Sequence, residues 1–110
     1  VKSKDAKISF QDGGFQRGNA LFETIRFNKN HLFNIDSHIK RLRSGLNYLE
    51  FKIDKTDDEL INLIKETITK NNLTYGVVNL VISNNFDINN PFKRICCFPK
   101  SIYFINFLFN

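Results

Sequence analysis

Two successive segments in the middle of this chain carry apolar residues at helical spacing, and β-prone segments lie on both sides of them. In the first segment the apolar residues recur every three or four positions, at Ile39, Leu42, Leu46 and Leu49. This spacing places them on one face of a helix, so the segment predicts an amphipathic helix. Asp36 or Ser37 can cap the free N–H groups at its start.

The second helical segment begins with a recognisable start signal. Thr56 is followed three residues later by Glu59, which is the pattern of a capping box. Behind this pair comes a stripe of residues suited to burial, at Leu60, Leu63, Ile64, Thr67 and Ile68. Asn71 and Asn72 then offer a C-terminal stop, so we expect a second helix between Thr56 and this asparagine pair.

Strand-like patterns precede the two helices. Residues 7–10 alternate like a strand, and the polar, glycine-containing run at 11–14 indicates a turn. Residues 20–27 and 31–35 each fit a strand, and residues 28–30 between them fit a turn. We therefore expect these two strands to form a β-hairpin.

Strand-like patterns also follow the helices. Gly76 is expected to break the chain before a strand at residues 77–82. The polar run 84–91 indicates a loop, and 102–109 indicates a last, buried strand. Two helices packed on one face of a mainly antiparallel sheet define an α+β two-layer domain, which is the fold class we expect. A length of 110 residues fits a single domain that covers residues 1–110.

Composition and charge exclude several classes of protein. An apolar fraction of 42% is normal for a globular chain, and no apolar run approaches the roughly 18 residues that a membrane helix needs. The two cysteines, Cys96 and Cys97, are adjacent and cannot build a disulfide framework, which favours a cytoplasmic protein. The net charge is +5, but the basic residues are scattered among acids, so we expect neither a membrane nor a nucleic acid as partner.

Several potential motifs fit a structural role better than a chemical one. Gly18 is followed by Asn19, which does not complete a phosphate loop, so the glycines of this region are expected to serve turns with positive φ. His31 and His38 lack the spacing of a metal site, and vicinal cysteines could not easily join one tetrahedral ion. We therefore expect no metal site, and no catalytic residue is assigned.

A group on the first helix has more chemical potential. His38, Arg41 and Gly45 recur at i, i+3 and i+7, beside the apolar stripe. A guanidinium at a helix edge can hold a phosphate in bidentate geometry, and a glycine one turn later would leave room for the bound group. The same spacing also fits the solvated flank of an amphipathic helix, and spacing alone favours that second interpretation.

Two motifs carry a resemblance to a known family. Residues 12–26 read DGGFQRGNALFETIR, and residues 38–42 read HIKRL. In motif, spacing and element order the chain resembles the class IV aminotransferases, which are fold-type IV pyridoxal-phosphate (PLP) enzymes. This family includes branched-chain aminotransferases, D-amino-acid aminotransferases and 4-amino-4-deoxychorismate lyases. The resemblance covers residues 6–84 well and is to the small N-terminal domain of these enzymes.

The resemblance implies roles for two residues. The arginine of His-x-x-Arg-Leu binds the PLP phosphate in this family, which implies that Arg41 is a cofactor-binding residue. The aromatic residue before the motif glutamate faces the active site, which implies that Phe22 contributes to the substrate pocket. The resemblance further implies transamination or lyase chemistry on an amino acid or aminodeoxychorismate, in amino-acid or folate-precursor metabolism, and a homodimeric assembly.

The chain also departs from the family pattern. The lysine that forms the Schiff base with PLP lies in a larger second domain, and no lysine of this chain stands in the matching context. Asn19 stands where the family usually has aspartate, and Asn79 where many lyase-like members have arginine. We therefore expect a truncated member that is not catalytic as this chain alone, which leaves its status as an enzyme open. The alternative is a non-catalytic binding or assembly module built on the same fold.

Overall fold

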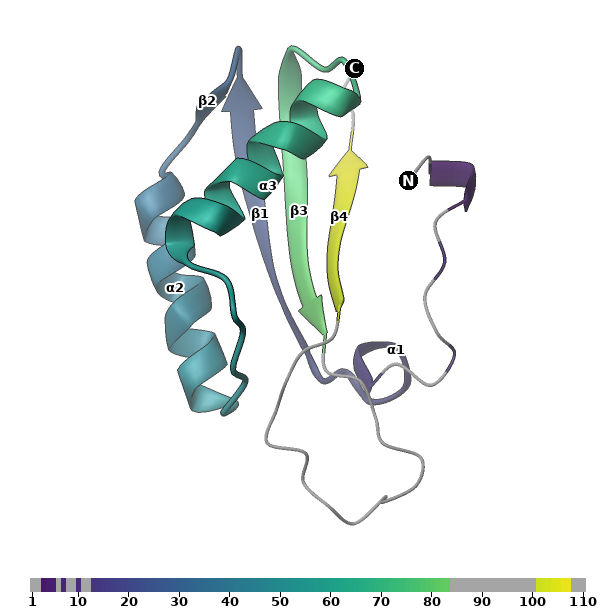
Figure 1. Cartoon of the computed structure of the whole chain (residues 1–110), viewed down its shortest axis with the longest axis vertical. Coiled ribbons are helices and arrows are strands. Elements are labelled where there is room, and N and C mark those ends of the chain that lie inside the picture. The colour runs from purple at the N-terminus through teal and green to yellow at the C-terminus, as the bar shows by residue number, and fades with distance from the viewer. Residues whose placement is uncertain (1–2, 6, 8–9, 11–12, 84–100, 108–110) are drawn as a thin grey trace.

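The computed structural model describes residues 3–5, 7, 10, 13–83 and 101–107, and these residues form an antiparallel sheet with two long helices packed on it (Figure 1). The elements, in chain order, are η1 (Ser3–Asp5), α1 (Gly13–Arg17), β1 (Ala20–Asn28), β2 (His31–Leu32), α2 (Ile35–Tyr48), α3 (Asp57–Lys70), β3 (Tyr75–Ser83) and β4 (Ser101–Phe107). The expected α+β class is confirmed.

The sheet has the strand order β2-β1-β3-β4, and each neighbouring pair is antiparallel. In Figure 1, α3 crosses in front of the sheet and α2 lies beside β1. The longest pairing joins β1 to β3, from Ala20 opposite Ser83 to Asn28 opposite Tyr75. Because side chains alternate between the faces of a strand, this register decides which residues of β1 point at the helices.

The hairpin between β1 and β2 is confirmed, but it is shorter than expected. Lys29 and Asn30 form its loop with φ angles of 48° and 65°. Two successive positive φ angles are typical of a type I′ turn, whose twist matches the twist of the flanking strands. The predicted strand at 31–35 is wrong beyond Leu32, because α2 already begins at Ile35.

The start of α2 also differs from the prediction. Asn34 is the N-cap residue, in the left-handed conformation (φ 53°, ψ 34°) and without a side-chain cap bond, so Asp36 and Ser37 are not caps. Asparagine tolerates this conformation, which turns the chain from β2 directly into the helix. At the other end, Leu49 is the C-cap residue and is 37% exposed, so it does not belong to the buried stripe.

The predicted capping box of α3 is confirmed in both directions. The backbone N–H of Glu59 donates to Thr56 Oγ1 at 3.2 Å, and the backbone N–H of Thr56 donates to Glu59 Oε2 at 3.0 Å. These two bonds satisfy donors that a helix start otherwise leaves to water. The helix ends at Lys70, with Asn71 as its C-cap residue, as the asparagine pair indicates.

The segment before β1 contains two corrections. Lys7 and Phe10 lie outside the strands, so the predicted strand at 7–10 is wrong at these two positions, and residues 8–9 lie outside the described residues. The turn predicted at 11–14 is wrong at Gly13, which begins α1. The chain continues as a helical turn there because the backbone N–H of Gly18 reaches back to the carbonyl of Gly14.

Gly76 does not break the chain before a strand but lies inside β3, opposite Phe27. Its φ of 151° is a conformation that glycine adopts readily, which lets the strand begin one residue earlier, at Tyr75. Residues 102–107 of the predicted last strand are confirmed in β4. The predicted loop at 84–91 and residues 108–109 lie outside the described residues.

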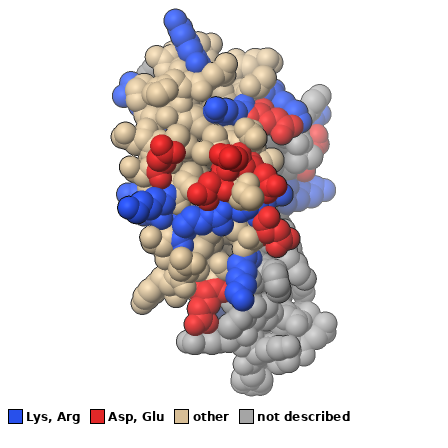
Figure 2. All heavy atoms as spheres, turned by 60° about the vertical axis from the view of Figure 1, so that its left-hand side comes forward, with Lys and Arg blue, Asp and Glu red and all other residues tan. Residues whose placement is uncertain are grey.

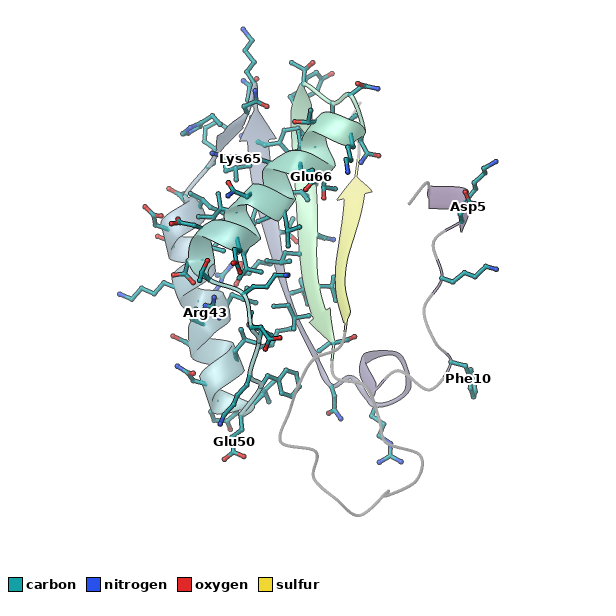
Figure 3. All side chains as sticks on the ribbon, viewed as in Figure 1. Asp5, Phe10, Arg43, Glu50, Lys65 and Glu66 are labelled. Carbon is teal, nitrogen blue, oxygen red and sulfur yellow. The ribbon has the colours of Figure 1, made fainter. Side chains whose placement is uncertain are left out.

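The core lies between the sheet and the two long helices, where the side chains of both layers meet (Figure 3). Its buried hydrophobic residues are Ile25, Phe27, Leu32, Ile39, Leu42, Leu46, Phe51, Leu60, Ile64, Ile68, Val78, Leu80 and Ile82. The apolar stripes of α2 and α3 therefore face the sheet, as their spacing predicts. In the part of the chain that is described, no helix has the length and apolar character needed to cross a membrane.

Candidate functional site

A buried carboxylate lies among apolar neighbours on the helix-facing side of β1. Glu23 shares this side with Ile25 and Phe27, because residues 22–28 of β1 alternate strictly between exposed and buried. Only 5% of the Glu23 side chain is exposed. Burial of an ionised group is costly unless hydrogen-bond donors surround it, so the partners of Glu23 define the site.

Two residues of α2, one helical turn apart, donate to this carboxylate. Arg41 binds it side-on, with Nε 2.7 Å from Oε1 and Nη2 2.6 Å from Oε2 of Glu23. His38 places Nδ1 2.7 Å from the same Oε2. The i, i+3 spacing of His38 and Arg41 puts both on the side of α2 that faces β1. The structure therefore joins them through Glu23, a residue that is 15 and 18 positions away.

Electrostatics keep this carboxylate ionised. The hydrogen bonds from Arg41 lower the pKa of Glu23, burial acts in the opposite direction, and the hydrogen bond from His38 lowers it further. In return, the hydrogen bonds to Glu23 raise the pKa of Arg41. Because an ionised carboxylate only accepts hydrogen bonds, Nδ1 of His38 carries the proton of the bond between them.

Arg41 keeps donors that Glu23 does not use. A guanidinium has five N–H groups, and Glu23 takes one from Nε and one from Nη2. The edge formed by Nη1 and the second N–H of Nη2 stays available, and the Arg41 side chain is 72% exposed. Such an edge matches two oxygens of a phosphate or carboxylate. The predicted phosphate-binding residue is thus a fixed cation with one free edge.

Phe22 lies on the other face of β1 from Glu23. Its neighbours along this face are Thr24, which donates a hydrogen bond to Asn79 of β3, and Arg26, whose guanidinium lies 5.4 Å from the ring centre of Phe33. Phe22 itself is 69% exposed. The structure therefore does not bring Phe22 and Arg41 together, because Phe22 points away from α2, whereas Arg41 lies on α2 beside the other face of β1.

Gly45 does not leave room for a bound group beside Arg41. A Cβ atom at this position would lie 3.0 and 3.2 Å from the two Cδ atoms of Leu21. The absence of a side chain at Gly45 therefore lets α2 approach β1 closely. This packing role corrects the expectation from spacing, and Leu21 is the group that fills the space.

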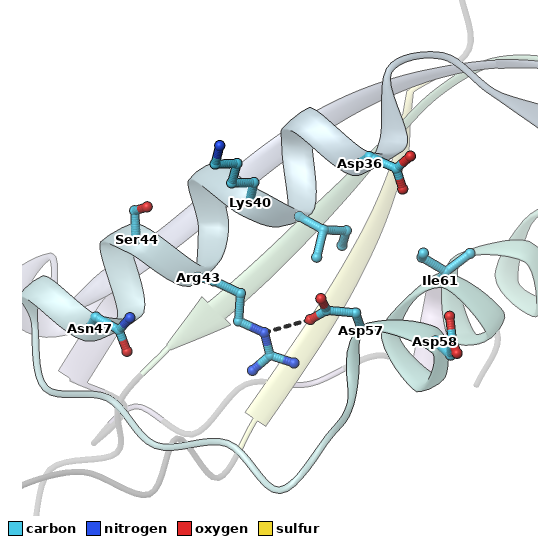
Figure 4. Close-up of a pocket in the computed structure, with 9 residues that line it drawn as sticks. Asp36, Lys40, Arg43, Ser44, Asn47, Asp57, Asp58 and Ile61 are labelled. Atoms are coloured by element: carbon cyan, nitrogen blue, oxygen red, sulfur yellow. Dashed lines mark hydrogen bonds and ion pairs between the residues drawn. The ribbon is translucent and has the colours of Figure 1, made fainter.

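A separate pocket of about 470 Å³ opens between α2 and the start of α3 (Figure 4). Arg43 crosses it and donates from Nε to Asp57 Oδ1 at 2.7 Å and from Nη2 to the carbonyl of Lys55. The remaining charged lining residues have both signs, namely Asp36, Lys40 and Asp58. Figure 2 shows acidic and basic side chains intermixed over this face, which is unlike the continuous basic surface of a nucleic-acid site.

No metal site is found among the residues that the structure describes, where no group of three or more His, Cys, Asp or Glu side chains converges. His31 instead packs edge-on against Phe33, with 4.7 Å between the ring centres. Gly18 has the positive φ expected of a turn glycine, at 69°. Cys96 and Cys97 lie outside the described residues.

Sequence reasoning missed Glu23 as a partner of Arg41, although a signal was present. Strict alternation over β1 puts Glu23 on the same side as Ile25 and Phe27, and a glutamate at a buried position needs a cation or several donors. The identity of those donors depends on how α2 packs on β1. That tertiary contact has no signature in the spacing of either element.

Comparison with known proteins identifies the class to which this fold and site belong. The sequence model of the family "Amino-transferase class IV" matches residues 20–98, which is more than half of the chain. A protein of Methanocaldococcus jannaschii assigned as a branched-chain-amino-acid aminotransferase is 36% identical over 83 residues, which cover 76% of this chain and 29% of the relative. The chain belongs to the class IV aminotransferase family.

Solved structures add to this result. A Legionella pneumophila protein described as a 4-amino-4-deoxychorismate lyase superposes with a TM-score of 0.81 at 22% identity, over 98% of this chain and 39% of that protein. The Thermus thermophilus branched-chain amino acid aminotransferase with pyridoxamine 5′-phosphate superposes with a TM-score of 0.70 at 24% identity, over 77% of this chain and 30% of that protein. At these identities the likeness shows the fold, and the chain spans between about 30% and 40% of these proteins.

Proposed function

We propose that this chain is the small-domain part of a PLP-dependent aminotransferase or 4-amino-4-deoxychorismate lyase, in which Arg41 holds the phosphate of the cofactor. The observation that carries the proposal is the guanidinium of Arg41, which Glu23 fixes along one edge while the side chain stays 72% exposed. A phosphate monoester dianion needs a fixed cation with free N–H donors, so the residues present fit that group. Family membership and the relative with bound pyridoxamine 5′-phosphate support the choice of cofactor.

The residues of this chain would bind and orient, and the cofactor would supply the chemistry. When bound, PLP provides the electron sink that stabilises negative charge next to the amino group of a substrate. Arg41 would hold the phosphate end through the edge that Glu23 leaves free. Phe22 would form an apolar wall on the substrate side, since it lies exposed on the opposite face of β1. The cofactor and substrate contacts would thus come from the two sides of one strand.

We propose further that this chain alone does not catalyse the reaction. Its support is that no lysine here stands in the context of the family's Schiff-base lysine, which acts as nucleophile and base. The test is to incubate the 110-residue chain with PLP, reduce with borohydride and map adducts by mass spectrometry. We expect no stoichiometric adduct at a single lysine, and one such adduct would overturn this part of the proposal.

The phosphate role of Arg41 is tested with pyridoxamine 5′-phosphate, which has no aldehyde to react with lysines. Its binding is followed by NMR, through the arginine Nε–H signals of the ¹⁵N-labelled chain. We expect a saturable shift of the Arg41 signal in the wild-type chain. In Arg41→Ala, where this signal is absent, we expect the backbone amide signals to show no saturable shift. Arg43→Ala is the matched control, because Arg43 lies two residues further on the same helix but is tied to Asp57. Binding that persists in Arg41→Ala would refute the assignment.

A second candidate function is a non-catalytic assembly module on the same fold. The observation behind it is the open face of the sheet, where Phe22 and Tyr75 are exposed and Val77 and Val81 are half-buried. Exposed apolar groups favour a face that another part of a protein covers, which can be a second domain or the second copy in a homodimer. Sedimentation of the purified chain tests how this face is covered, because a stable dimer would favour a second copy, whereas a monomer would favour a second domain. The paucity of cysteines supports a cytoplasmic location.

A further inference from the structure

We infer that Glu23 is a positioning residue, which holds the guanidinium of Arg41 by its Nε/Nη2 edge so that the Nη1/Nη2 edge faces a phosphate monoester. This inference rests on the proposed function of Arg41 and deepens it. It assigns a role to a carboxylate that makes no contact with the ligand. It also predicts that loss of the Glu23 carboxylate weakens phosphate binding, whereas charge repulsion alone would predict tighter binding.

The first support is the geometry of the pair. Two parallel bonds of 2.7 and 2.6 Å join the planar guanidinium of Arg41 to the planar carboxylate of Glu23. A single bond would leave the guanidinium free to rotate about it, whereas two bonds fix its plane. Once the side-on edge is taken, the end-on edge is the remaining pair of parallel donors. Its direction is therefore set by Glu23.

The second support is the rigidity of the carboxylate. Glu23 lies within β1, directly opposite Leu80 of β3, and its side chain is almost fully buried. His38 donates to Oε2 as well, so that atom accepts from both residues of α2. A carboxylate with three donors and no room to move is a fixed reference point for the arginine.

The third support is the contrast with the neighbouring arginine of α2. Arg43 also forms a hydrogen bond from Nε to a carboxylate, but its partner Asp57 has a side chain that is 58% exposed. Its Nη2 turns to the carbonyl of Lys55 instead of the same carboxylate. Arg43 thus ties two segments together, whereas Arg41 is clamped along one edge and open on the other.

The sign of the Glu23 effect makes the inference testable. A carboxylate close to an anion site repels the anion, so loss of the Glu23 charge should tighten phosphate binding if electrostatics alone decide. If the orientation of Arg41 decides, loss of its two hydrogen bonds to Glu23 should weaken phosphate binding. The guanidinium would then have to be ordered when phosphate binds, and that entropic cost lowers the affinity. In Glu23→Gln the amide has one acceptor oxygen and one NH2 group, so it cannot accept the Nε and Nη2 N–H groups of Arg41 on two separate oxygens.

The experiment titrates the 110-residue chain with inorganic phosphate and with pyridoxamine 5′-phosphate, and follows the Arg41 Nε–H signal by NMR. We expect Glu23→Gln to weaken both affinities about fivefold, which corresponds to the loss of one hydrogen bond. Glu66→Gln removes the same charge from an exposed pair with Lys70 and should leave both affinities unchanged. Equal or tighter binding in Glu23→Gln would overturn the inference while leaving Arg41 as the phosphate anchor.

Two further outcomes of the titration also decide the question, namely an unresponsive wild-type chain and an unfolded Glu23→Gln variant. If wild-type Arg41 does not respond to either phosphate compound, the proposed function and this inference both fail. If Glu23→Gln loses its fold, as judged by circular dichroism, Glu23→Asp provides the measurement. The shorter side chain keeps the charge but retracts the carboxylate from Arg41, so we expect weaker binding there too. Wild-type affinity in a folded Glu23→Asp would overturn the positioning role.

Discussion

Replacement of Thr56 by alanine tests how the start of α3 is held. The hydroxyl of Thr56 accepts the backbone N–H of Glu59, and the carboxylate of Glu59 accepts the backbone N–H of Thr56. Thr56→Ala removes the first bond, and the side chain of Glu59 then lacks the hydroxyl that completes the capping box. We expect the free energy of unfolding to fall by about 1 kcal/mol, the usual cost of losing a threonine cap.

For this cap we expect a loss of unfolding free energy in the middle of the range known for threonine caps, and not at its upper end. Both bonds are exposed, so water can replace the lost hydroxyl in part. Asp57 and Asp58 also remain in the first turn, where their charges favour the positive end of the helix dipole. A loss of about 2 kcal/mol would require a buried cap, which this one is not.

The assay is urea denaturation followed by far-UV circular dichroism. With a slope of about 2 kcal/mol per molar urea, the expected midpoint shift is about 0.5 M. Thr69→Ala is the matched control, because Thr69 is exposed on the same helix and its hydroxyl bonds only the carbonyl of Lys65. Alanine is the better helix former, so this variant should gain about 0.5 kcal/mol. Equal destabilisation by both substitutions would refute the capping argument.

Three further predictions concern the sheet. Because Arg41 and His38 lower the pKa of Glu23 below 4.5 in the folded chain, its ionised form stabilises the fold above pH 4.5 and this contribution is lost as the pH falls through the lowered pKa. Urea midpoints measured from about pH 6 to about pH 3 should therefore fall less in Glu23→Gln than in wild type. Leu80→Ala should cost about 2–5 kcal/mol in denaturation experiments, since Leu80 is fully buried, whereas Val81→Ala, at a half-buried position of the open face, should cost less than about 1 kcal/mol. Gly76→Ala should lower the melting temperature through a cost above about 1 kcal/mol, because φ at Gly76 is 151°.

The parts of the fold that follow local rules could be predicted from the sequence. The capping box at Thr56 and the buried stripes of both helices depend on residues within one or two turns of each other, so spacing is sufficient evidence. The start of α2 could not be predicted this way, because it is set by Asn34 in a left-handed conformation and not by a side-chain cap. Asp36 and Ser37 indicate a cap in the sequence, but they lie in the first turn of the helix. The same polar residue types are common at the N-cap and in the first turn, so residue type alone does not distinguish the two positions.

The candidate site was predictable only in part for a similar reason. The His-x-x-Arg-Leu motif at residues 38–42 identifies Arg41, because the motif contains the residue type that the family has at this position. Its partner Glu23 comes from another element, and the bond between them exists only after α2 has packed on β1. Gly45 shows the same limit, because its neighbour Leu21 belongs to β1 and not to a bound group. Contacts between residues of different elements can therefore be identified only once the packing of those elements is known.

The alternation of β1 connects the two halves of the proposed site. Glu23 presents its carboxylate to α2, and Phe22, one residue earlier, points to the open face, so a register shift of one residue would exchange the two. That register is held far from both residues, by the type I′ loop at Lys29 and Asn30 and by the bond from the Lys29 N–H to the Thr74 carbonyl at 2.7 Å. Together with the β1–β3 pairing, the hairpin loop therefore helps to determine that Glu23 faces α2, where Arg41 is the proposed phosphate anchor, and that Phe22 faces the side proposed for substrate.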